Sequence, residues 1–183
     1  MTRIIGGVAG SRKLIAPAKS TRPTSDRVRE SIFNRLEART GLDGFAVLDL
    51  YAGTGALALE ALSRGAARAL LVESGKAAAQ VCKRNSELVG LDGLKVIERS
   101  VMSFLAAPSG ETAFDLVFID PPYEVSNDEV SHNLEELLPL LAPEATVVLE
   151  RASRSGEVEL PDGYELEDTK NYGDTTVFWI SLA

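Results

Sequence analysis

The tetrapeptide Asp120-Pro121-Pro122-Tyr123 places a carboxylate, a stiff corner and an aromatic ring directly after the apolar run Phe114–Ile119. A proline cannot donate to a sheet ladder, and it restricts the residue before it to extended conformations. A strand over 114–119 must therefore end here, with the carboxylate, a main-chain carbonyl and the ring in fixed relation. Two acceptors beside a stacking surface suit a flat base with an exocyclic NH2 group, which offers two donors. The corner therefore predicts chemistry on the amine of a nucleobase that is unpaired or flipped out of its helix.

A second motif, running from Asp49 to Ala56, follows the apolar run 45–50. Gly53 and Gly55 let a ligand approach the main chain, and a following helix would present free N–H groups. Glu73 ends the next predicted strand, where a carboxylate can accept both hydrogens of a ribose diol. These features alone fit a nicotinamide dinucleotide. An acid at position 49, if it is not merely a capping group, repels a pyrophosphate and suits the ammonium of S-adenosylmethionine.

S-adenosylmethionine is therefore the predicted cofactor. A further contact is expected after the third strand of the sheet, where a main-chain N–H can meet the adenine edge. The predicted cofactor-binding residues are Asp49, Tyr51, Gly53, Gly55, Glu73, Ser100 and Val101.

The 183-residue chain is long enough for one well-filled domain, and its 45% hydrophobic and 25% charged residues are ordinary for a globular protein. Its single cysteine, Cys82, excludes an internal disulfide and a cysteine-rich zinc site. With His132 as the only histidine, a protein-bound catalytic metal is not expected. No apolar stretch reaches transmembrane length, and the N-terminus lacks the apolar core of a signal peptide. We expect a cytoplasmic protein without a membrane partner.

The net charge of −8 conceals a strong asymmetry. Residues 1–39 carry nine Lys or Arg and three Asp or Glu, a net charge of +6, whereas the remainder carries −14. A basic end on an acidic body predicts a localised contact with a polyanion. The alternative is a solvated surface whose charge is merely uneven.

The hydrophobic pattern predicts the elements that position these residues. Segments 3–7 and 11–15 suggest two short strands around a glycine turn, and a helix over 26–39 is capped by Ser25 or Thr24. Arg29 projects onto the apolar face of that helix, as either a structural ion pair or a ligand clamp. Strands are then expected at 45–50, 69–73, 94–98, 114–119, 145–150, 164–171 and 175–182, with helices at 56–64, 75–89, 102–106 and 128–141.

The last two strands have no room for a helix between them, so they must form an antiparallel hairpin. The fold class is thus α/β: a doubly wound, mostly parallel, seven-stranded sheet with a C-terminal antiparallel hairpin. A basic N-terminal β-hairpin extension (1–22) precedes the main domain (23–183).

Together these motifs resemble the class I S-adenosylmethionine-dependent methyltransferases, which are Rossmann-like, and more narrowly the RsmD family. The resemblance is carried by Arg3-Ile4-Ile5-Gly6-Gly7, Arg12-Lys13-Leu14, Arg22-Pro23-Thr24, Asp26-Arg27-Val28-Arg29-Glu30, Phe33-Asn34, Gly53-Thr54-Gly55-Ala56-Leu57, Leu59-Glu60-Ala61-Leu62-Ser63-Arg64, Met102-Ser103-Phe104-Leu105 and Asp120-Pro121-Pro122-Tyr123. It implies methylation of the exocyclic N2 of one guanine in 16S rRNA. Asp120 to Tyr123 would then form the catalytic pocket for the base.

The resemblance also implies RNA contacts from Arg3, Arg12, Lys13, Arg22, Thr24, Arg27 and Arg29. The implied partner is 16S rRNA within a small ribosomal subunit or an assembly intermediate, approached by a monomer. Val8-Ala9-Gly10 and Ser100 depart from the family pattern at the RNA and adenine contacts. Two alternatives stay open: a DNA adenine-N6 or cytosine-N4 methyltransferase, and a non-catalytic RNA-binding assembly factor.

Overall fold

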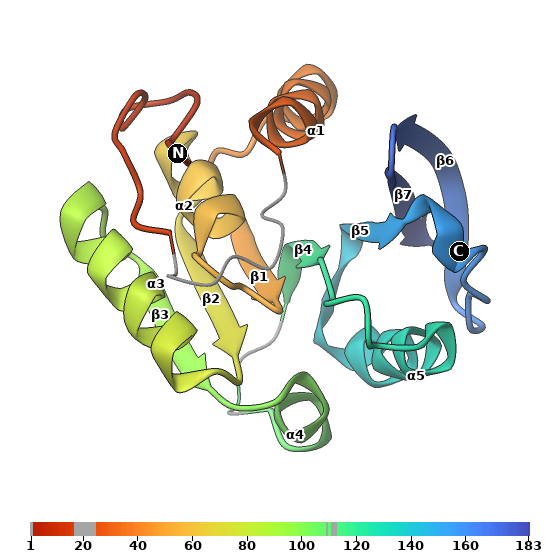
Figure 1. Cartoon of the computed structure of the whole chain (residues 1–183). Helices are drawn as coiled ribbons and strands as arrows, with labels where there is room; N and C mark the ends of the chain where they lie inside the picture. Colours follow the sequence, from red (N-terminus) through yellow and green to blue (C-terminus); the bar gives the residue numbers. More distant parts are fainter. Residues whose placement is uncertain (1, 17–24, 109, 111–112) are drawn as a thin grey trace.

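Seven strands form one mixed sheet in the order β3-β2-β1-β4-β5-β7-β6 (Figure 1). The structure is a computed structural model and describes residues 2–16, 25–108, 110 and 113–183. The strands are β1 (Ala46–Leu50), β2 (Arg68–Glu73), β3 (Leu94–Glu98), β4 (Phe114–Ile119), β5 (Leu141–Ala152), β6 (Tyr164–Tyr172) and β7 (Thr175–Leu182). The first five pair in parallel, and β7 pairs antiparallel with both β5 and β6. The predicted fold class is confirmed.

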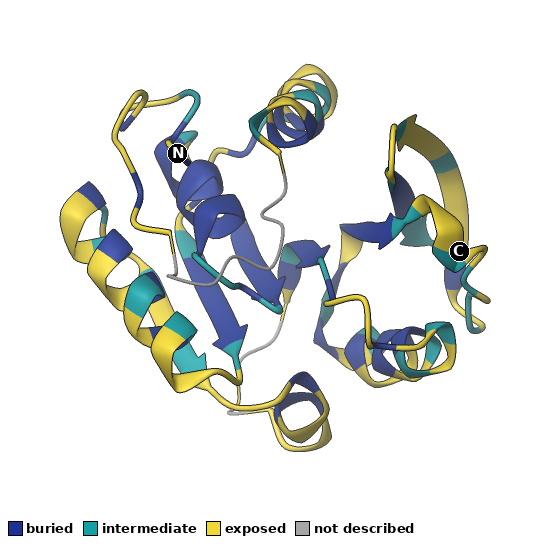
Figure 2. Cartoon of the chain, in the orientation of Figure 1, coloured by how far each residue is buried: buried dark blue, intermediate teal, exposed yellow. Residues whose placement is uncertain are grey.

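The strand order reverses between β1 and β4, and open α/β sheets commonly bind ligands outside the carboxyl ends of the strands at such a point. Figure 1 shows the helices on both faces of the sheet. The helices are α1 (Asp26–Arg39), α2 (Ala56–Ser63), α3 (Lys76–Val89), α4 (Val101–Ala106) and α5 (Asn127–Leu137). Apolar residues of α1 and α2 share one core with the sheet, and those of α4 and α5 share a second core. This double cover explains why every residue of β1 is buried (Figure 2).

Helix α1 begins and ends as its sequence predicts. Ser25 caps its first turn, because the Ser25 hydroxyl accepts a hydrogen bond from Val28 N at 3.2 Å. Near its other end, Arg35 lies over the Trp179 ring of β7 at 4.4 Å and also pairs with Asp168 of β6. The helix is thereby packed against the C-terminal hairpin.

The N-terminal segment forms a very short antiparallel hairpin, so the strands predicted at 3–7 and 11–15 pair over only part of their length. The bridge between Arg3 and Lys13 is flanked by main-chain hydrogen bonds from Ile4 N to Arg12 O and from Leu14 N to Thr2 O, both at 2.9 Å. Beyond this pairing, the amides of Ile5 and Gly6 donate to the Glu60 carboxylate of α2, at 2.7 and 2.8 Å. These two amides dock the segment on α2.

Gly7 brings the N-terminal segment against α2. Its φ is +75°, and a Cβ at this position would lie 1.9 Å from the main-chain oxygen of Ser63. The Ser63 hydroxyl donates to Gly6 O at 2.6 Å and accepts from Ala9 N at 2.9 Å. No side chain fits between the two segments, so this glycine is required by close approach.

The end of α5 is a second correction. The predicted helix over 128–141 ends at Leu137 and passes through a short 3-10 turn, Leu138–Leu140, into β5. Pro139 lies in that turn, and a proline interrupts an α-helix because it lacks an N–H and clashes with the preceding turn. Strand β5 consequently begins at Leu141, four residues before the predicted start.

Candidate active site

The loop between β1 and α2 is shaped by two glycines with positive φ. Gly53 has a φ of +58°, and a Cβ there would meet only Tyr51 O, at 3.9 Å. Gly55, with a φ of +77°, caps α2, and a Cβ there would lie 2.9 Å from Leu71 Cδ2. Gly55 is therefore needed for packing, whereas Gly53 leaves its outer side open to a ligand.

Glu73 braces this loop from the end of β2. Its Oε2 accepts a hydrogen bond from Gly53 N at 2.9 Å, and its Oε1 accepts one from Gly75 N at 2.8 Å. A carboxylate offers about four acceptor positions, so each oxygen retains capacity for a further donor. Glu73 can thus hold the loop and accept from a ribose diol at once.

Asp49 is buried beneath the same loop, with 1% of its surface exposed. Its Oδ2 accepts a hydrogen bond from Ala58 N at 3.3 Å, so the capping role that the sequence allows is present. Burial, reinforced by the nearby Asp120 and Glu73 charges, raises the pKa of Asp49 well above its usual value. Three acidic residues from β1, β2 and the end of β4 therefore create a site that favours a cation.

The Asp120-Pro121-Pro122-Tyr123 corner follows β4 as predicted. Asp120 is half-buried, and Tyr123 is 53% exposed, with its ring on the surface. The turn is closed by a hydrogen bond from Val125 N to Pro122 O at 3.1 Å. The corner thus presents a carboxylate and an open aromatic face beside the cofactor loop.

Arg154 is a site residue that the sequence did not reveal. It lies in the turn Ser153–Ser155 after β5, and its guanidinium carbon is 5.2 Å from the centre of the Tyr123 ring. Strands β4 and β5 are paired up to Ile119 and Leu149, so the residues that follow each strand meet at the same edge. That neighbourhood was implied by the predicted strand order, but nothing in the local sequence singles out Arg154.

Tyr51 has a φ of +62°, which is strained for a residue with a Cβ. Its hydroxyl accepts a hydrogen bond from Asn133 Nδ2 of α5 at 2.8 Å, and burial raises the pKa of Tyr51 to about 12. The phenol therefore contacts α5, and only its main chain belongs to the loop.

Ser100 and Val101 lie at the start of α4, after β3. The Ser100 hydroxyl caps the helix by accepting from Ser103 N at 3.1 Å. The first-turn amides of a helix have no partner within it, so Val101 N has no acceptor inside α4. The adenine contact remains a prediction.

Some of the basic residues that are expected to contact RNA are exposed to solvent. Arg3, Arg12, Lys13 and Arg27 are exposed. Arg12 also donates to Val89 O at the carboxyl end of α3, where a cation is favoured by the helix dipole. Arg22 and Thr24 lie outside the described residues.

Arg29 is the exception, because it is completely buried. It donates to Arg3 O and to Asp26 Oδ1, the latter at 3.0 Å, and its Nε lies 3.8 Å from Glu60 Oε2. Burial lowers the pKa of Arg29, and the Asp26 and Glu60 charges oppose that effect. The structural ion pair, and not the ligand clamp, is the role that this structure shows, so direct RNA contact by Arg29 was a wrong expectation.

Two further side chains, Cys82 and Asn85, hydrogen-bond to the main chain of the loop between β1 and α2. Cys82 Sγ donates to Gly53 O at 3.1 Å, and burial raises the pKa of the thiol to about 12. Asn85 donates to both Thr54 O and Ile15 O, at 2.9 and 3.0 Å, and accepts from Ile15 N at 2.7 Å. Asn85 therefore joins the N-terminal segment to the cofactor loop, a link that the sequence did not indicate.

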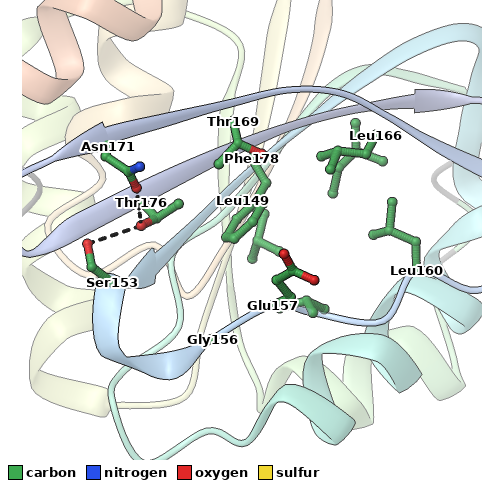
Figure 3. Close-up of a pocket in the computed structure, with 12 residues that line it drawn as sticks. Leu149, Ser153, Gly156, Glu157, Leu160, Leu166, Thr169, Asn171, Thr176 and Phe178 are labelled. Atoms are coloured by element: carbon green, nitrogen blue, oxygen red, sulfur yellow. Dashed lines mark hydrogen bonds between the residues drawn. The ribbon is translucent and has the colours of Figure 1, made fainter.

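A groove of about 410 Å³ lies apart from these residues, between β7, β6 and the segment after β5 (Figure 3). Leu149, Leu166 and Phe178 form its apolar wall. At one end Thr176 Oγ1 bonds to Ser153 Oγ at 3.0 Å and to Asn171 Oδ1 at 2.8 Å. None of the predicted cofactor or base residues lines it.

Within the described ranges, no group of three or more His, Cys, Asp or Glu side chains is placed to hold a metal ion. His132 is exposed and lies 3.3 Å from Glu135 on α5. None of the helices in this part of the chain is both long and apolar enough to span a bilayer.

Comparison with known proteins connects this geometry to a family. Residues 2–181 match the family model described as conserved hypothetical protein 95, which is the RsmD family. The chain is 40% identical over 172 residues to ribosomal RNA small subunit methyltransferase D of Escherichia coli, covering 93% of this chain and 85% of that protein. It is 37% identical over 163 residues to the putative rRNA methyltransferase YlbH of Bacillus subtilis, covering 87% and 86%.

Solved structures agree. The putative methyltransferase yhhF from Escherichia coli superposes with a TM-score of 0.85 at 33% identity, covering 98% of this chain and 97% of that one. A hypothetical protein of Thermus thermophilus gives 0.84 at 31% identity and covers 98% of both chains. A magnesium protoporphyrin IX methyltransferase from Synechocystis, solved with bound S-adenosylmethionine, shares the fold at 16% identity and a TM-score of 0.68, covering 86% of this chain and 79% of that one. By the family match and by its identity to these relatives, the chain belongs to the RsmD family of methyltransferases.

Proposed function

We propose that this protein transfers a methyl group from S-adenosylmethionine to the exocyclic N2 of one guanine in 16S rRNA, guanine 966. The observation that carries the proposal is the meeting of two motifs at one sheet edge. The acid-flanked glycine loop after β1 and the Asp120 corner after β4 lie side by side, and the Asp120 charge acts on Asp49. The family match supports an rRNA methyltransferase.

The residues at this sheet edge fit the cofactor. Gly53 leaves open space beside the loop, Glu73 retains acceptor capacity for a diol, and Asp49 sits where the structure favours a cation. When bound, S-adenosylmethionine supplies an activated methyl group. Asp49, Gly53, Gly55 and Glu73 would hold it, with Ser100 and Val101 at the adenine end.

The corner supplies what an amine acceptor needs. An aromatic amine is a weak nucleophile, because its lone pair is delocalised into the ring. Ionised Asp120 and the carbonyl of Pro121 can each accept a hydrogen bond from one N–H group of the amine. These two contacts orient the nitrogen and let it pyramidalise. The amine proton becomes acidic only after methylation, so no strong base is required beforehand. Tyr123 would stack on the flipped base, a contact worth about 1–3 kcal/mol.

The RNA is proposed to lie along the basic N-terminal segment and the start of α1. Arg3, Arg12, Lys13 and Arg27 are exposed there, and their charges suit a phosphate backbone. We propose that the substrate is rRNA in a small ribosomal subunit or an assembly intermediate, approached by a cytoplasmic monomer. The acidic remainder of the chain would disfavour extensive contact with naked RNA.

Radiolabelled methyl transfer to small-subunit particles that lack their own modifications tests the proposal, with Asp120→Ala as the matched inactive control. Label recovered as N2-methylguanosine supports it, provided that the variant binds RNA but transfers no label. Label in another base keeps a methyltransferase but contradicts the guanine. If DNA offered in a parallel reaction is labelled and the particles are not, the DNA amine methyltransferase is favoured. Absence of label with cofactor bound favours the non-catalytic assembly factor.

A further inference from the structure

Arg151, near the end of β5, is a buried cation beside the candidate base site. Only 6% of the residue is exposed. Its Nη2 donates to Val125 O at 2.8 Å and to Asn127 Oδ1 at 2.9 Å, and its Nε donates to the same Oδ1 at 3.1 Å. The planar guanidinium therefore hydrogen-bonds to two acceptors, Val125 O and Asn127 Oδ1, with a geometry that a lysine cannot reproduce.

Both acceptors belong to the segment that links the Asp120-Pro121-Pro122-Tyr123 corner to α5. Val125 N already bonds to Pro122 O, and Ser126 caps α5 by accepting from Glu129 N at 3.1 Å. Arg151 thus ties the middle of this short connection to β5. Strand β4 holds the corner at its other end, and Val125 itself packs into the apolar core, so Arg151 adds a polar tie to this connection.

The same network continues to the turn that carries Arg154. Asn127 Nδ2 donates to Ser155 O at 2.7 Å and to Glu157 O at 3.0 Å. Arg154 lies in this turn and covers the Tyr123 ring. Asn127, held by Arg151, therefore links the turn that carries Arg154 to the segment that follows the corner.

The charge of Arg151 also acts on the corner. Burial lowers the pKa of Arg151, while the Tyr51 and Asp120 groups oppose that effect. The carboxylates of Asp120 and Asp49 repel each other, which favours protonation of one of them. The positive charge of Arg151 interacts with Asp120, opposes that tendency and favours the ionised carboxylate.

We propose that Arg151 is a positioning residue for methyl transfer, which fixes the corner through Val125 and Asn127. This inference rests on the proposed function for its catalytic part. Arg151 does not touch the reacting atoms itself. Its contribution is to the place of the groups that do, and its charge supports the acceptor role of Asp120.

The test compares Arg151→Met, Arg151→Lys and the parent protein, with Arg39→Met as the matched control. Arg39 pairs with Glu167 at the surface of the C-terminal hairpin and has no contact with the corner. Arg151→Met should lower kcat by about 10- to 100-fold, the scale of a small misplacement of reacting groups. The dissociation constant of S-adenosylmethionine and the KM for the particle should stay within about threefold of the parent values, a range small against that kcat loss.

The pH dependence of kcat distinguishes the effect of the Arg151 charge from the effect of its hydrogen bonds. Charged groups that interact with Asp120 include Asp49 on β1 and Arg151 on β5; Asp49 also interacts with Glu73 at the end of β2, and Tyr51 interacts with Arg151 and with Glu129 of α5. Arg151→Met removes a cation that favours the ionised Asp120 carboxylate, so the acid limb of its profile should move to higher pH. Arg151→Lys should keep the acid limb of the pH profile near its parent position, because the lysine ammonium restores the positive charge. Its kcat should stay reduced, because an ammonium cannot reproduce the hydrogen bonds of the planar guanidinium to Val125 and Asn127.

Hydrogen exchange of residues 120–127 gives a readout without substrate. Arg151→Met should exchange faster in this segment, and Arg39→Met should match the parent. A parent protein that labels no guanine would refute the proposed function, while the exchange result would still decide whether Arg151 fixes the corner. Unchanged kcat and exchange in Arg151→Met would overturn the inference. So would losses of kcat, cofactor affinity and melting temperature in proportion, because they would indicate a general structural role.

Discussion

The Glu60→Gln substitution should loosen the N-terminal segment from α2 and lower the free energy of unfolding by about 3–5 kcal/mol. Glu60 is fully buried, and its carboxylate accepts three hydrogen bonds: from Ile5 N, from Gly6 N and from Arg64 Nε at 2.8 Å. Its Oε2 also lies 3.8 Å from Arg29 Nε. The carboxylate therefore serves two arginines and two main-chain amides at once.

The magnitude follows from these contacts. Glutamine keeps one acceptor oxygen and turns an NH2 group towards the other donors, so at least one charge-assisted hydrogen bond is lost, at about 1.5–3 kcal/mol. The negative charge that balances the buried guanidinium of Arg29 also disappears, although Asp26 remains. Breaking a buried ion pair from one side costs about 3–5 kcal/mol in total. The protein should still fold, with a melting temperature lower by roughly 6–20 °C.

Urea unfolding measures the change, and Glu37→Gln is the matched control. Glu37 makes the same kind of contact, 2.9 Å to Arg64 Nη1, but its side chain is 48% exposed. The control should lose less than about 1 kcal/mol. If Glu60→Gln lost no more than the control, the reasoning that the N-terminal segment depends on this carboxylate would be refuted.

Three further outcomes are expected. Glu73→Ala should weaken binding of S-adenosylmethionine by about 1–3 kcal/mol in calorimetry, the cost of an unpaired buried group, and an unchanged affinity would remove Glu73 from the site. Because the pKa of Asp49 is raised, this acid becomes ionised only as the pH rises through that pKa. The affinity for the cofactor should therefore rise with pH, and binding should release protons. A binding enthalpy that does not depend on the ionisation heat of the buffer would contradict this. Reversing Arg12 and Lys13 to Glu should weaken RNA association and flatten its salt dependence, with cofactor affinity unchanged; RNA binding equal to that of the parent at low salt would count against the basic contact.

The sheet was predictable because its strands are apolar and end at strong signals. The run 114–119 is bounded by the proline corner, and β4 has those limits. The helix after it was predicted too long, because its apolar spacing continues past Leu137 while Pro139 forbids continuation. Apolar periodicity thus located the elements, and local backbone chemistry decided where they end.

The site was predictable where one short segment carries the chemistry. The glycine loop and the corner could be found this way, because their spacing alone implies a role. Arg151 and Arg154 could not, since their importance comes from the pairing of β4 with β5 and from acceptors more than twenty residues away. The two expected N-terminal strands are shorter than predicted for a related reason: beyond the pairing of Arg3 with Lys13, the segment is held by the Glu60 carboxylate, far along the chain.

The amide of Asn85 has a practical consequence for dissecting this protein. By holding Ile15 and Thr54 together, it makes the first fifteen residues a structural support of the cofactor loop. Deleting them to obtain a version that is defective only in RNA binding would also free Asn85 and disturb the loop. Point substitutions at exposed side chains, which leave that amide in place, are therefore the sound way to separate recognition of RNA from recognition of the methyl donor.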